Sequence, residues 1–305
     1  MKKLNSKSAD LVKSIARELM KCEVNTKIPT TQELAAMFTG GFGTIDKAMN
    51  ALKETGAIKL QSKGQLGTIL LEKNMAALWS IIDQGALVGS FPLPNTIEFG
   101  GLATGLIEMF KEKQVVCNLT FKNGATLRLK QLLEHQCDFV VMSDLSAEQA
   151  CSKYPNLRSI CMMGNNSYYS DLIILRRKEV SPEMEKWRIG LDSTSNDHIT
   201  LSDQVFSTNE KIDVHYGNIP YLIAEGKIDA AIWHSTQLVP TALIEILAVQ
   251  KVDYSQAGSE KNMAAAIVIE EDRKEIAAMF DELCDVQLIE RIQQEVISRK
   301  RSPAY

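Results

Sequence analysis

Polar side chains follow several apolar segments in the last three quarters of the chain, where they could meet at one edge of a sheet. In open α/β sheets, ligands bind beyond the carboxyl ends of the strands, because helix N-termini there present free N–H groups to anions. Hydroxyls and amides predominate, which favours a small polar ligand with a carboxylate or a phosphate, and Asp144 and Asp192 would add recognition of an amine or a hydroxyl. The predicted ligand-binding residues are Ser90, Asn123, Thr126, Ser143, Asp144, Asp192, Ser193, Thr194, Ser195, Tyr216, Asn218, Trp233 and His234.

Purely structural roles remain open for several of these residues. Thr126 or Ser195 can serve only as a helix cap, because hydroxyl residues are favoured at that position. Trp233 can belong to the core, and His234 can bond only to a backbone carbonyl. The functional interpretation therefore depends on the set lying together in one cleft.

The same residue types could also perform acid–base chemistry. Asp192, Asp197 and His198 would suit a proton-transfer group, but a loop before a helix contains such residues as caps in any case. The chain has no GxSxG, P-loop or HExxH motif and no Cys–His pair arranged for nucleophilic catalysis. We predict that the protein is not an enzyme, although bilobal enzymes of comparable topology exist.

Composition narrows the class of protein. The 6 cysteines include no CxxC pair, and the 4 histidines do not stand beside them at metal-ligand spacing. Free thiols in a reducing compartment explain these cysteines, and we predict no metal and no cofactor. The N-terminus lacks the apolar stretch of a secretory signal, and no run approaches the ~18–20 apolar residues of a membrane span. We expect a cytoplasmic protein that contacts no membrane.

Alternating strand and helix patterns must position the polar residues. Two segments, 124–143 and 217–234, share one order: a glycine turn, a helix, and then Asp before a buried strand. This duplication predicts a parallel α/β domain of two lobes, with lobe 1 at about 76–172 and 259–305 and lobe 2 at about 173–258. The predicted strands are 85–90, 115–120, 137–142, 169–175, 186–191, 211–215, 229–233 and 264–269, and a long amphipathic helix over about 273–299 follows them.

A different pattern occupies residues 1–75. Apolar residues at helical spacing predict a first helix from Ser8, and Thr30 with Glu33 three residues later forms a capping box that begins a second helix. Glycines at 40–41 predict the sharp turn to a third helix. Two apolar runs around a glycine-bearing turn then predict a β-hairpin. Three helices followed by a hairpin constitute a winged helix-turn-helix.

Charge separates the two regions. Residues 1–75 contain 12 Lys and Arg against 7 Asp and Glu, whereas the remaining chain contains 22 against 31. A basic domain on an acidic one is typical of a phosphate-binding region, although chance clustering of solvated lysines gives the same count. We therefore predict double-stranded DNA as the partner. The predicted DNA-binding residues are Thr30, Gln32, Thr44, Lys47, Asn50, Lys59 and Lys63.

The N-terminal domain resembles the GntR-type regulators, whose order of conserved residue types it follows. The matching residues are Ile28, Pro29, Thr30, Glu33, Leu34, Ala35, Thr44, Ile45, Ala48, Met49, Leu52, Gly56, Ile58, Gly64 and Gly67. The chain departs from the family at Gln32, Phe42 and Asp46, where the family carries arginines. Because Arg-to-guanine contacts are the commonest specific readout, loss of DNA binding stays open. Thr44 and Lys47 can still hold phosphates, and Asn50 can read adenine.

The duplicated α/β pattern resembles the type II periplasmic-binding fold, which also forms the sensor domain of LysR-type regulators. Combined with the GntR-like domain, the chain resembles the YhfZ family of bacterial transcription regulators. The resemblance implies a regulator that binds operator DNA and senses a small-molecule effector. We expect a homodimer, held by residues 72–84 or by the sensor domain, because such regulators pair two heads on two half-sites. A protein–protein adaptor without DNA binding and a bilobal-fold enzyme remain alternatives.

Overall fold

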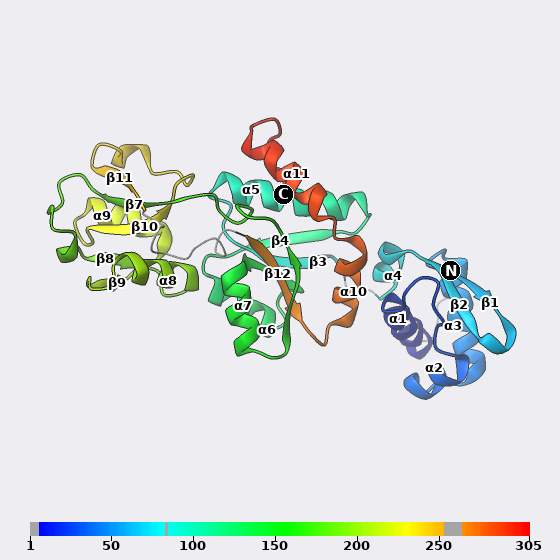
Figure 1. Ribbon diagram of the computed structural model, residues 1–305. Coiled ribbons are helices and arrows are strands. Elements are labelled where there is room, and N and C mark those ends of the chain that lie inside the picture. The colour runs from blue at the N-terminus through cyan, green and yellow to red at the C-terminus, as the bar shows by residue number, and fades with distance from the viewer. Residues whose placement is uncertain (1–5, 83–84, 253–263) are drawn as a thin grey trace. The chain divides into compact units, whose positions relative to one another are not determined.

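The computed structural model describes residues 6–82, 85–252 and 264–305 (Figure 1). These residues form two compact units. The first consists of the chain up to Leu87, together with Phe110–Val116 and Arg273–Cys284. The second consists of Val88–Met109, Cys117–Asp272 and Asp285–Tyr305.

The first unit contains the winged helix-turn-helix that the sequence predicts. Its elements are α1 (Ser6–Met20), α2 (Thr31–Phe38), α3 (Phe42–Glu54), β1 (Ile58–Ser62), the 3₁₀ turn η1 (Gly64–Leu66) and β2 (Thr68–Lys73). The two strands pair antiparallel and form the wing. Ile15, Leu19, Leu34, Ile45 and Leu52 are buried between the helices, because residues three and four apart share one helix face.

The turn between α2 and α3 differs from the expected one. The left-handed backbone conformation at this turn is adopted by Thr39, at φ 52°, and not by Gly40 or Gly41. The N–H group of Thr39 donates to the carbonyl oxygen of Ala35 and so ends α2. Gly40 is needed for space, since a Cβ there would lie 3.2 Å from Cδ1 of Ile45. The prediction that glycine relieves this turn is therefore wrong.

Two further helices belong to the first unit and contact α1. They are α4 (Met75–Ile82), whose sequence is almost entirely apolar, and α10 (Lys274–Leu283). Phe280 of α10 meets Phe110 edge to face, with ring centroids 5.4 Å apart. Apolar burial therefore joins these two helices to the helical domain.

The buried ammonium of Lys73 adds a polar tie at the end of β2. It pairs with the carboxylate of Glu282 on α10 at 2.8 Å. It also donates to the carbonyl oxygens of Met20 and Cys22, each at 2.9 Å, at the end of α1. A buried cation needs such a set of acceptors, because its transfer from water is costly without them. Lys73 thus holds β2, α1 and α10 at one point.

Lobe 1 contains a mixed sheet of strand order β4-β3-β5-β12-β6. Its strands are β3 (Leu87–Phe91), β4 (Cys117–Phe121), β5 (Phe139–Ser143), β6 (Leu157–Met162) and β12 (Ala265–Glu270). Its helices are α5 (Ile97–Glu112), α6 (Ala125–Leu133), α7 (Asp144–Lys153) and α11 (Val286–Ile297). Helices α6 and α7 cover one face of the sheet, and α5 and α11 lie on the other (Figure 1). All six residues of β12 are buried, as expected for a central strand covered on both faces.

Lobe 2 contains the second mixed sheet, of order β11-β7-β10-β8-β9. Its strands are β7 (Leu172–Arg177), β8 (Ile189–Leu191), β9 (Lys211–Asp213), β10 (Ala230–His234) and β11 (Leu247–Lys251). Its helices are α8 (Asn196–Val205) and α9 (Ile219–Ala224), with short 3₁₀ turns η2 (Met184–Lys186), η3 (Tyr216–Asn218) and η4 (Thr241–Leu243). The buried core joins β7, β10 and α9 through Leu175, Ile219, Ile223 and Trp233.

The predicted α/β fold of two lobes is confirmed, but the sheets are not wholly parallel. β3 runs parallel to β5, as expected, and β8 runs parallel to β9 and β10. β12 is antiparallel to β5 and β6, and β7 is antiparallel to β10 and β11. Of these strands, β7 enters its sheet directly from lobe 1, without the crossover helix that sets a parallel direction.

Some elements were not predicted, and one was predicted too long. Strands β6 and β11 and helix α7 have no counterpart among the predicted elements. The helix predicted over 273–299 is two helices, because Asp285 begins α11 by accepting a hydrogen bond from the N–H of Leu288. The chain passes from lobe 1 to lobe 2 between β6 and β7. The lobe boundary predicted at 258–259 lies outside the described residues.

Candidate ligand cleft and DNA-binding surface

A cleft of about 60 Å³ lies within the second unit, between the two lobes. Lobe 1 contributes residues of α5 and α6, and lobe 2 contributes residues of α8, η3 and β10. The polar and aromatic side chains of its wall include Phe99, Asn123, Arg128, Tyr168, Asp192, Ser195, Asp197, His198, Tyr216 and His234. This edge of the two sheets is where parallel strands end and helices begin, as the strand-end argument predicts.

The one guanidinium of the cleft wall, Arg128, is 2% exposed. It stands on the buried face of α6 with Ala125 and Leu129. Its three hydrogen bonds to described residues go to neutral acceptors: Nε to the carbonyl oxygen of Val141 at 3.1 Å, Nη1 to that of Lys122 at 2.9 Å, and Nη2 to Oη of Tyr168 at 2.9 Å. These bonds fix its position without neutralising its charge.

Asp197 lies opposite, near the start of α8 in lobe 2, and is 7% exposed. Its Oδ1 accepts hydrogen bonds from the hydroxyls of Ser143 at 2.7 Å and Ser146 at 3.0 Å, both from lobe 1. Burial raises the pKa of Asp197, although the two hydroxyls and the charge of Arg128 act in the opposite direction. Asp197 is thus both a contact between the lobes and part of the cleft wall.

Asp192 is a second contact between the lobes. Its Oδ2 accepts from Nδ2 of Asn123 in lobe 1 at 2.9 Å and from the N–H of Tyr216 at 3.0 Å. Its Oδ1 accepts from both the N–H and the hydroxyl of Thr194. A buried carboxylate is stable when several donors surround it, and both oxygens of Asp192 are occupied in this way.

Aromatic side chains form the remaining wall. Tyr216 stacks on Trp233 with ring centroids 4.6 Å apart and meets His234 edge to face at 5.8 Å. His234 also meets Phe99 of lobe 1 at 5.6 Å. The Nδ1 atom of His234 is buried and has no hydrogen-bond partner among the described residues. A buried polar atom beside a cleft is available to a ligand, because leaving it unpaired is unfavourable.

Neither histidine of the cleft carries a positive charge near neutral pH. Burial lowers the pKa of His198 to about 4 and that of His234 to about 3. Nδ1 of His198 accepts from the N–H of Asp192 at 2.9 Å, and its Nε2 lies 3.1 Å from the carbonyl oxygen of Ile232. This pattern assigns the neutral form with the proton on Nε2. His198 is fully engaged in positioning, which removes it from a proton-transfer group.

The structure brings five of the predicted ligand-binding residues to the cleft wall: Asn123, Asp192, Ser195, Tyr216 and His234. Ser195 also caps α8, accepting from the N–H of His198 at 3.4 Å. The other predicted residues are not among those that line it: Ser90, Thr126, Ser143, Asp144, Ser193, Thr194, Asn218 and Trp233.

Several of these eight are engaged elsewhere. The hydroxyl of Ser90 donates to Oε1 of Gln131, and Ser143 caps α7 by accepting from the N–H of Ser146. Trp233 belongs to the core, as one of its two interpretations states, and is 1% exposed. That these residues bind a ligand stays a prediction.

Arg128 was missed because the sequence argument followed only the polar residues at strand ends. A signal for it exists. Arg128 occurs at the i+3 position of the apolar stripe that includes Ala125, Leu129 and Leu132. A charge on the buried face of an amphipathic helix is rare unless it serves a site or a partner.

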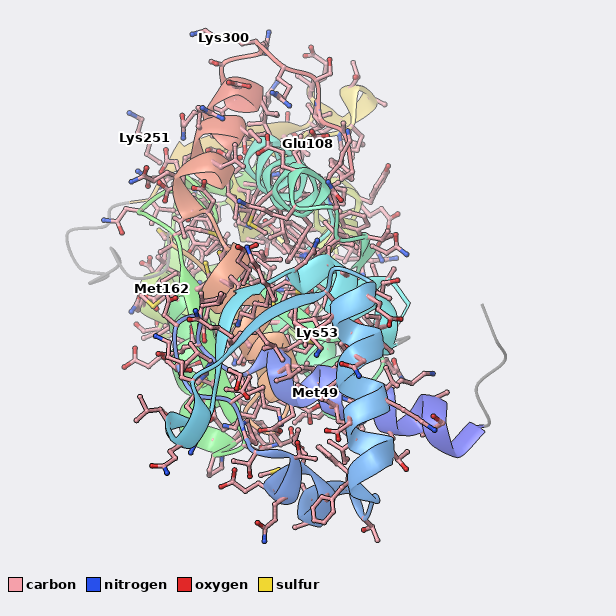
Figure 2. The ribbon with its side chains drawn as sticks, turned by 90° about the vertical axis from the view of Figure 1, so that its right-hand side faces the viewer. Met49, Lys53, Glu108, Met162, Lys251 and Lys300 are labelled. Atoms are coloured by element: carbon pink, nitrogen blue, oxygen red, sulfur yellow. The ribbon has the colours of Figure 1, made fainter. Side chains whose placement is uncertain are left out.

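All seven predicted DNA-binding residues are exposed on the first unit: Thr30, Gln32, Thr44, Lys47, Asn50, Lys59 and Lys63. Two are already engaged. Thr30 completes the capping box with Glu33, and Lys59 pairs with Glu72 at 2.7 Å. Figure 2 views α3 from the side, with Met49 and Lys53 one turn apart along it. Lys47 and Asn50 lie on the same helix. Phe42, at the position of a family arginine, is 60% exposed.

Two further properties concern the whole described chain. No group of three or more His, Cys, Asp or Glu side chains comes together as a metal site within residues 6–82, 85–252 and 264–305. Within the same ranges, no helix has both the length and the apolar character needed to cross a bilayer. All six cysteines are free thiols, and burial raises the pKa of Cys117 and Cys137 to about 12.

A winged helix-turn-helix followed by a bilobal domain is the architecture of a ligand-sensing regulator, and sequence comparison agrees with it. The profile of the YhfZ C-terminal domain matches residues 74–305, and a helix-turn-helix domain profile matches residues 24–70. The chain belongs to the YhfZ family. It is 26% identical to the uncharacterized protein YhfZ of Escherichia coli (strain K12), over 98% of each chain.

Solved structures support the same assignment. The crystal structure of YhfZ from Shigella flexneri matches with a TM-score of 0.60 and 28% identity, covering 76% of this chain and 98% of that one. The aliphatic sulphonate binding protein SsuA of Escherichia coli matches with a TM-score of 0.51 and 14% identity, covering 70% and 75%. The periplasmic VFT2 domain of Bordetella pertussis BvgS gives 0.51 and 12%, covering 73% and 96%. The last two likenesses show a periplasmic-binding fold.

The contact between the lobes is tight at Gly124, and this can be tested. A Cβ at Gly124 would collide with the side chain and carbonyl of Thr194, and its φ is +80°. We expect Gly124→Ala to separate the lobes locally and to destabilise the fold by about 1–3 kcal/mol. The N–H of Thr126, which donates to the carbonyl oxygen of Thr194 at 3.1 Å, should exchange faster with deuterium.

Gly85→Ala is the matched control, because Gly85 has φ +72° with no atom within 4 Å of the added Cβ. It carries the same backbone strain without the collision. Urea unfolding gives the stability and mass-spectrometric hydrogen exchange gives the protection of the N–H of Thr126. Equal protection in the two variants would show that the lobes do not depend on this contact.

Proposed function

We infer that the protein is a ligand-responsive bacterial transcription regulator, which binds operator DNA through its winged helix and a small polar, carboxylate- or phosphate-bearing metabolite in the cleft. The observation that carries the ligand half is the buried guanidinium of Arg128, which lines the cleft and has no carboxylate within ion-pair distance among the described residues. A DNA partner would require a cytoplasmic location.

The cost of burying a charge supports this role for Arg128. An isolated buried ion is unfavourable by several kcal/mol or more, and neutral hydrogen bonds offset only a part of that. A guanidinium has five N–H donors in a fixed fork, which matches a carboxylate or a phosphate. An anion in the cleft would complete its coordination.

The DNA half is supported by the helix-turn-helix profile and by the exposed residues of α3 and the wing. Lys47 and Lys63 would neutralise phosphates, and Asn50 would read an adenine edge. The missing arginines at Gln32, Phe42 and Asp46 are the one feature that favours an adaptor without DNA binding. DNA-binding measurements on variants of α3 and the wing distinguish the transcription regulator from the adaptor.

We expect Lys47→Ala and Lys63→Ala to weaken binding to all duplexes alike, and each to lower the salt slope of binding by about one ion. Asn50→Ala should relax the preference at a single base pair, with a cost of about 1–3 kcal/mol on the preferred site. Fluorescence anisotropy with duplexes selected from genomic fragments, at several salt concentrations, measures both effects. Lys21→Ala is the control, since this lysine is outside the predicted contact set and pairs with Glu18 at 2.8 Å.

If the purified wild-type chain retards no genomic fragment, even at low salt, the DNA-binding function is wrong and the adaptor is the better interpretation. An Asn50→Ala variant that weakens all duplexes equally would place that side chain on a phosphate.

The ligand half predicts a coupling between the cleft and DNA. A metabolite that raises the melting temperature should also change the DNA affinity, typically by ~1–3 kcal/mol in allosteric proteins. Arg128→Gln should abolish both responses and leave basal DNA binding intact. Lys47→Ala should keep the ligand-induced rise in melting temperature while losing DNA. A thermal-shift screen of metabolites against the three chains measures this, and a rise that survives Arg128→Gln would mean that the ligand binds elsewhere.

The proposal includes a homodimer, since two heads are needed to read two half-sites. The apolar side of α4, including Leu78 and Trp79, is already buried within the first unit, so we place the dimer contact on the sensor domain. Light scattering should give twice the mass of one chain. A monomer at all concentrations, with and without DNA, would contradict this part of the proposal.

A further inference from the structure

The cleft contains a guanidinium and a carboxyl group that do not pair with each other directly. Arg128 belongs to lobe 1 and Asp197 to lobe 2, and no ion pair joins them. Three hydrogen bonds engage the guanidinium, which leaves two of its five N–H groups. The two hydroxyls reach Oδ1 of Asp197, and no described residue donates to its Oδ2. Each group therefore retains capacity for a charged partner.

The other ionisable side chains of the cleft wall do not supply these partners. Asp192 adds a second carboxylate, but four hydrogen bonds already occupy its two oxygens. His198 and His234 are neutral, and no lysine lines the cleft among the described residues. Two carboxyl groups thus face one guanidinium, and burial disfavours the charged form of Asp197 unless a cation binds beside it. A dianion such as phosphate or sulfate would bring further negative charge beside both carboxyl groups.

We propose that the ligand is a small zwitterion, an amino acid in the broad sense, whose carboxylate binds Arg128 in lobe 1 and whose ammonium binds Oδ2 of Asp197 in lobe 2. The inference rests on the proposed function, in that it assumes a ligand in this cleft. The proposed function requires only a small anion as ligand, whereas this inference requires a molecule that carries a negative and a positive charge.

Size and wall chemistry agree with this class of ligand. About 60 Å³ is small beside the ~300–1,000 Å³ of sites for drug-sized molecules, so a closed cleft suits a compact ligand. The aromatic rings of Phe99, Tyr168 and Tyr216 supply the apolar part of the wall. Aromatic faces also attract ammonium groups. Binding to one charge on each lobe would hold the lobes together.

The test compares molecules that share one carbon skeleton. A thermal-shift screen of the full chain with the common amino acids identifies the best one. Calorimetry then compares it with the acids in which a hydroxyl or a hydrogen replaces the ammonium; for alanine these are lactate and propionate. Loss of a charge-assisted hydrogen bond should weaken binding about tenfold to a hundredfold. Inorganic phosphate and sulfate should bind more weakly than the amino acid.

The variant that isolates the ammonium contact is Asp197→Asn. It keeps an oxygen for the hydroxyls of Ser143 and Ser146 but removes the negative charge. The amino acid should lose its advantage, about tenfold or more, while the matched acid without an ammonium binds as well as before or better. Asp203→Asn is the control on the same helix, where an exposed carboxylate pairs with Lys211, and it should leave all affinities unchanged. Melting temperatures and circular dichroism verify that each variant is folded.

Each outcome is decisive. If plain carboxylates, phosphate or sulfate bind as tightly as the amino acid, the zwitterion is wrong while a ligand-sensing cleft stands. If a folded Asp197→Asn retains the full preference for the amino acid, the assigned ammonium contact is wrong. If neither the amino acids nor the wider metabolite screen changes the melting temperature, both the zwitterion and the proposed ligand sensing fail.

Discussion

Two buried carboxylates in the segment that leads into α8 determine how the lobes of the second unit meet. Asp192 accepts from its own turn, from Tyr216 and from Asn123 of lobe 1, and Asp197 accepts from Ser143 and Ser146 of lobe 1. A buried carboxylate is tolerated only when donors surround it, and here the donors come from both sides of the cleft. The contact is therefore polar and direction-specific, unlike the apolar packing inside each lobe. Because Gly124 has no Cβ, the backbone of lobe 1 can approach Thr194 closely enough for these bonds to form.

This kind of contact suits a reversible closure. A hydrogen bond to a charged group contributes only about 1.5–3 kcal/mol net, because water offers nearly the same partner when the lobes separate. A ligand that binds as proposed would shift the balance between open and closed forms by its differential affinity for the closed form. Arg128 is held by acceptors in lobe 1 and by Tyr168, just before the passage between lobes, so it keeps its position whichever way lobe 2 moves. In the proposed closure, the guanidinium would be the fixed half of the site and the α8 segment the half that moves toward it.

The sequence predicted those features that depend on neighbours along the chain. The winged helix-turn-helix follows from local periodicity, the Thr30–Glu33 capping box and the glycine-bearing turn of the wing, each confined to a few residues. The direction of β12 depends instead on a segment that returns from the other lobe, which periodicity cannot show. The same difference between local and long-range features applies to the candidate ligand site. Strand-end polarity identified Asp192 and His234, whereas Ser143 proved to bond with Asp197, 54 positions away. Arg128 required the opposite kind of reasoning, since its signal is a charge where the helix face should be apolar.

The N-terminal domain is subject to a related constraint, because few of its predicted DNA contacts are cations. Lys59 pairs with Glu72 and Thr30 completes its capping box, so the remaining predicted contacts are Gln32 on α2, three residues of α3 and Lys63 on the wing. One domain with so few cations and no arginine at the family positions would release few counterions on DNA, and its affinity alone would be low. Two domains held at a fixed spacing would multiply that affinity, since the second binds at a high effective concentration. If the proposed dimer forms, the spacing of its two DNA-binding domains therefore contributes more to discrimination between DNA sites than any single base contact. A change at the cleft that alters this spacing would then act on the largest part of DNA recognition.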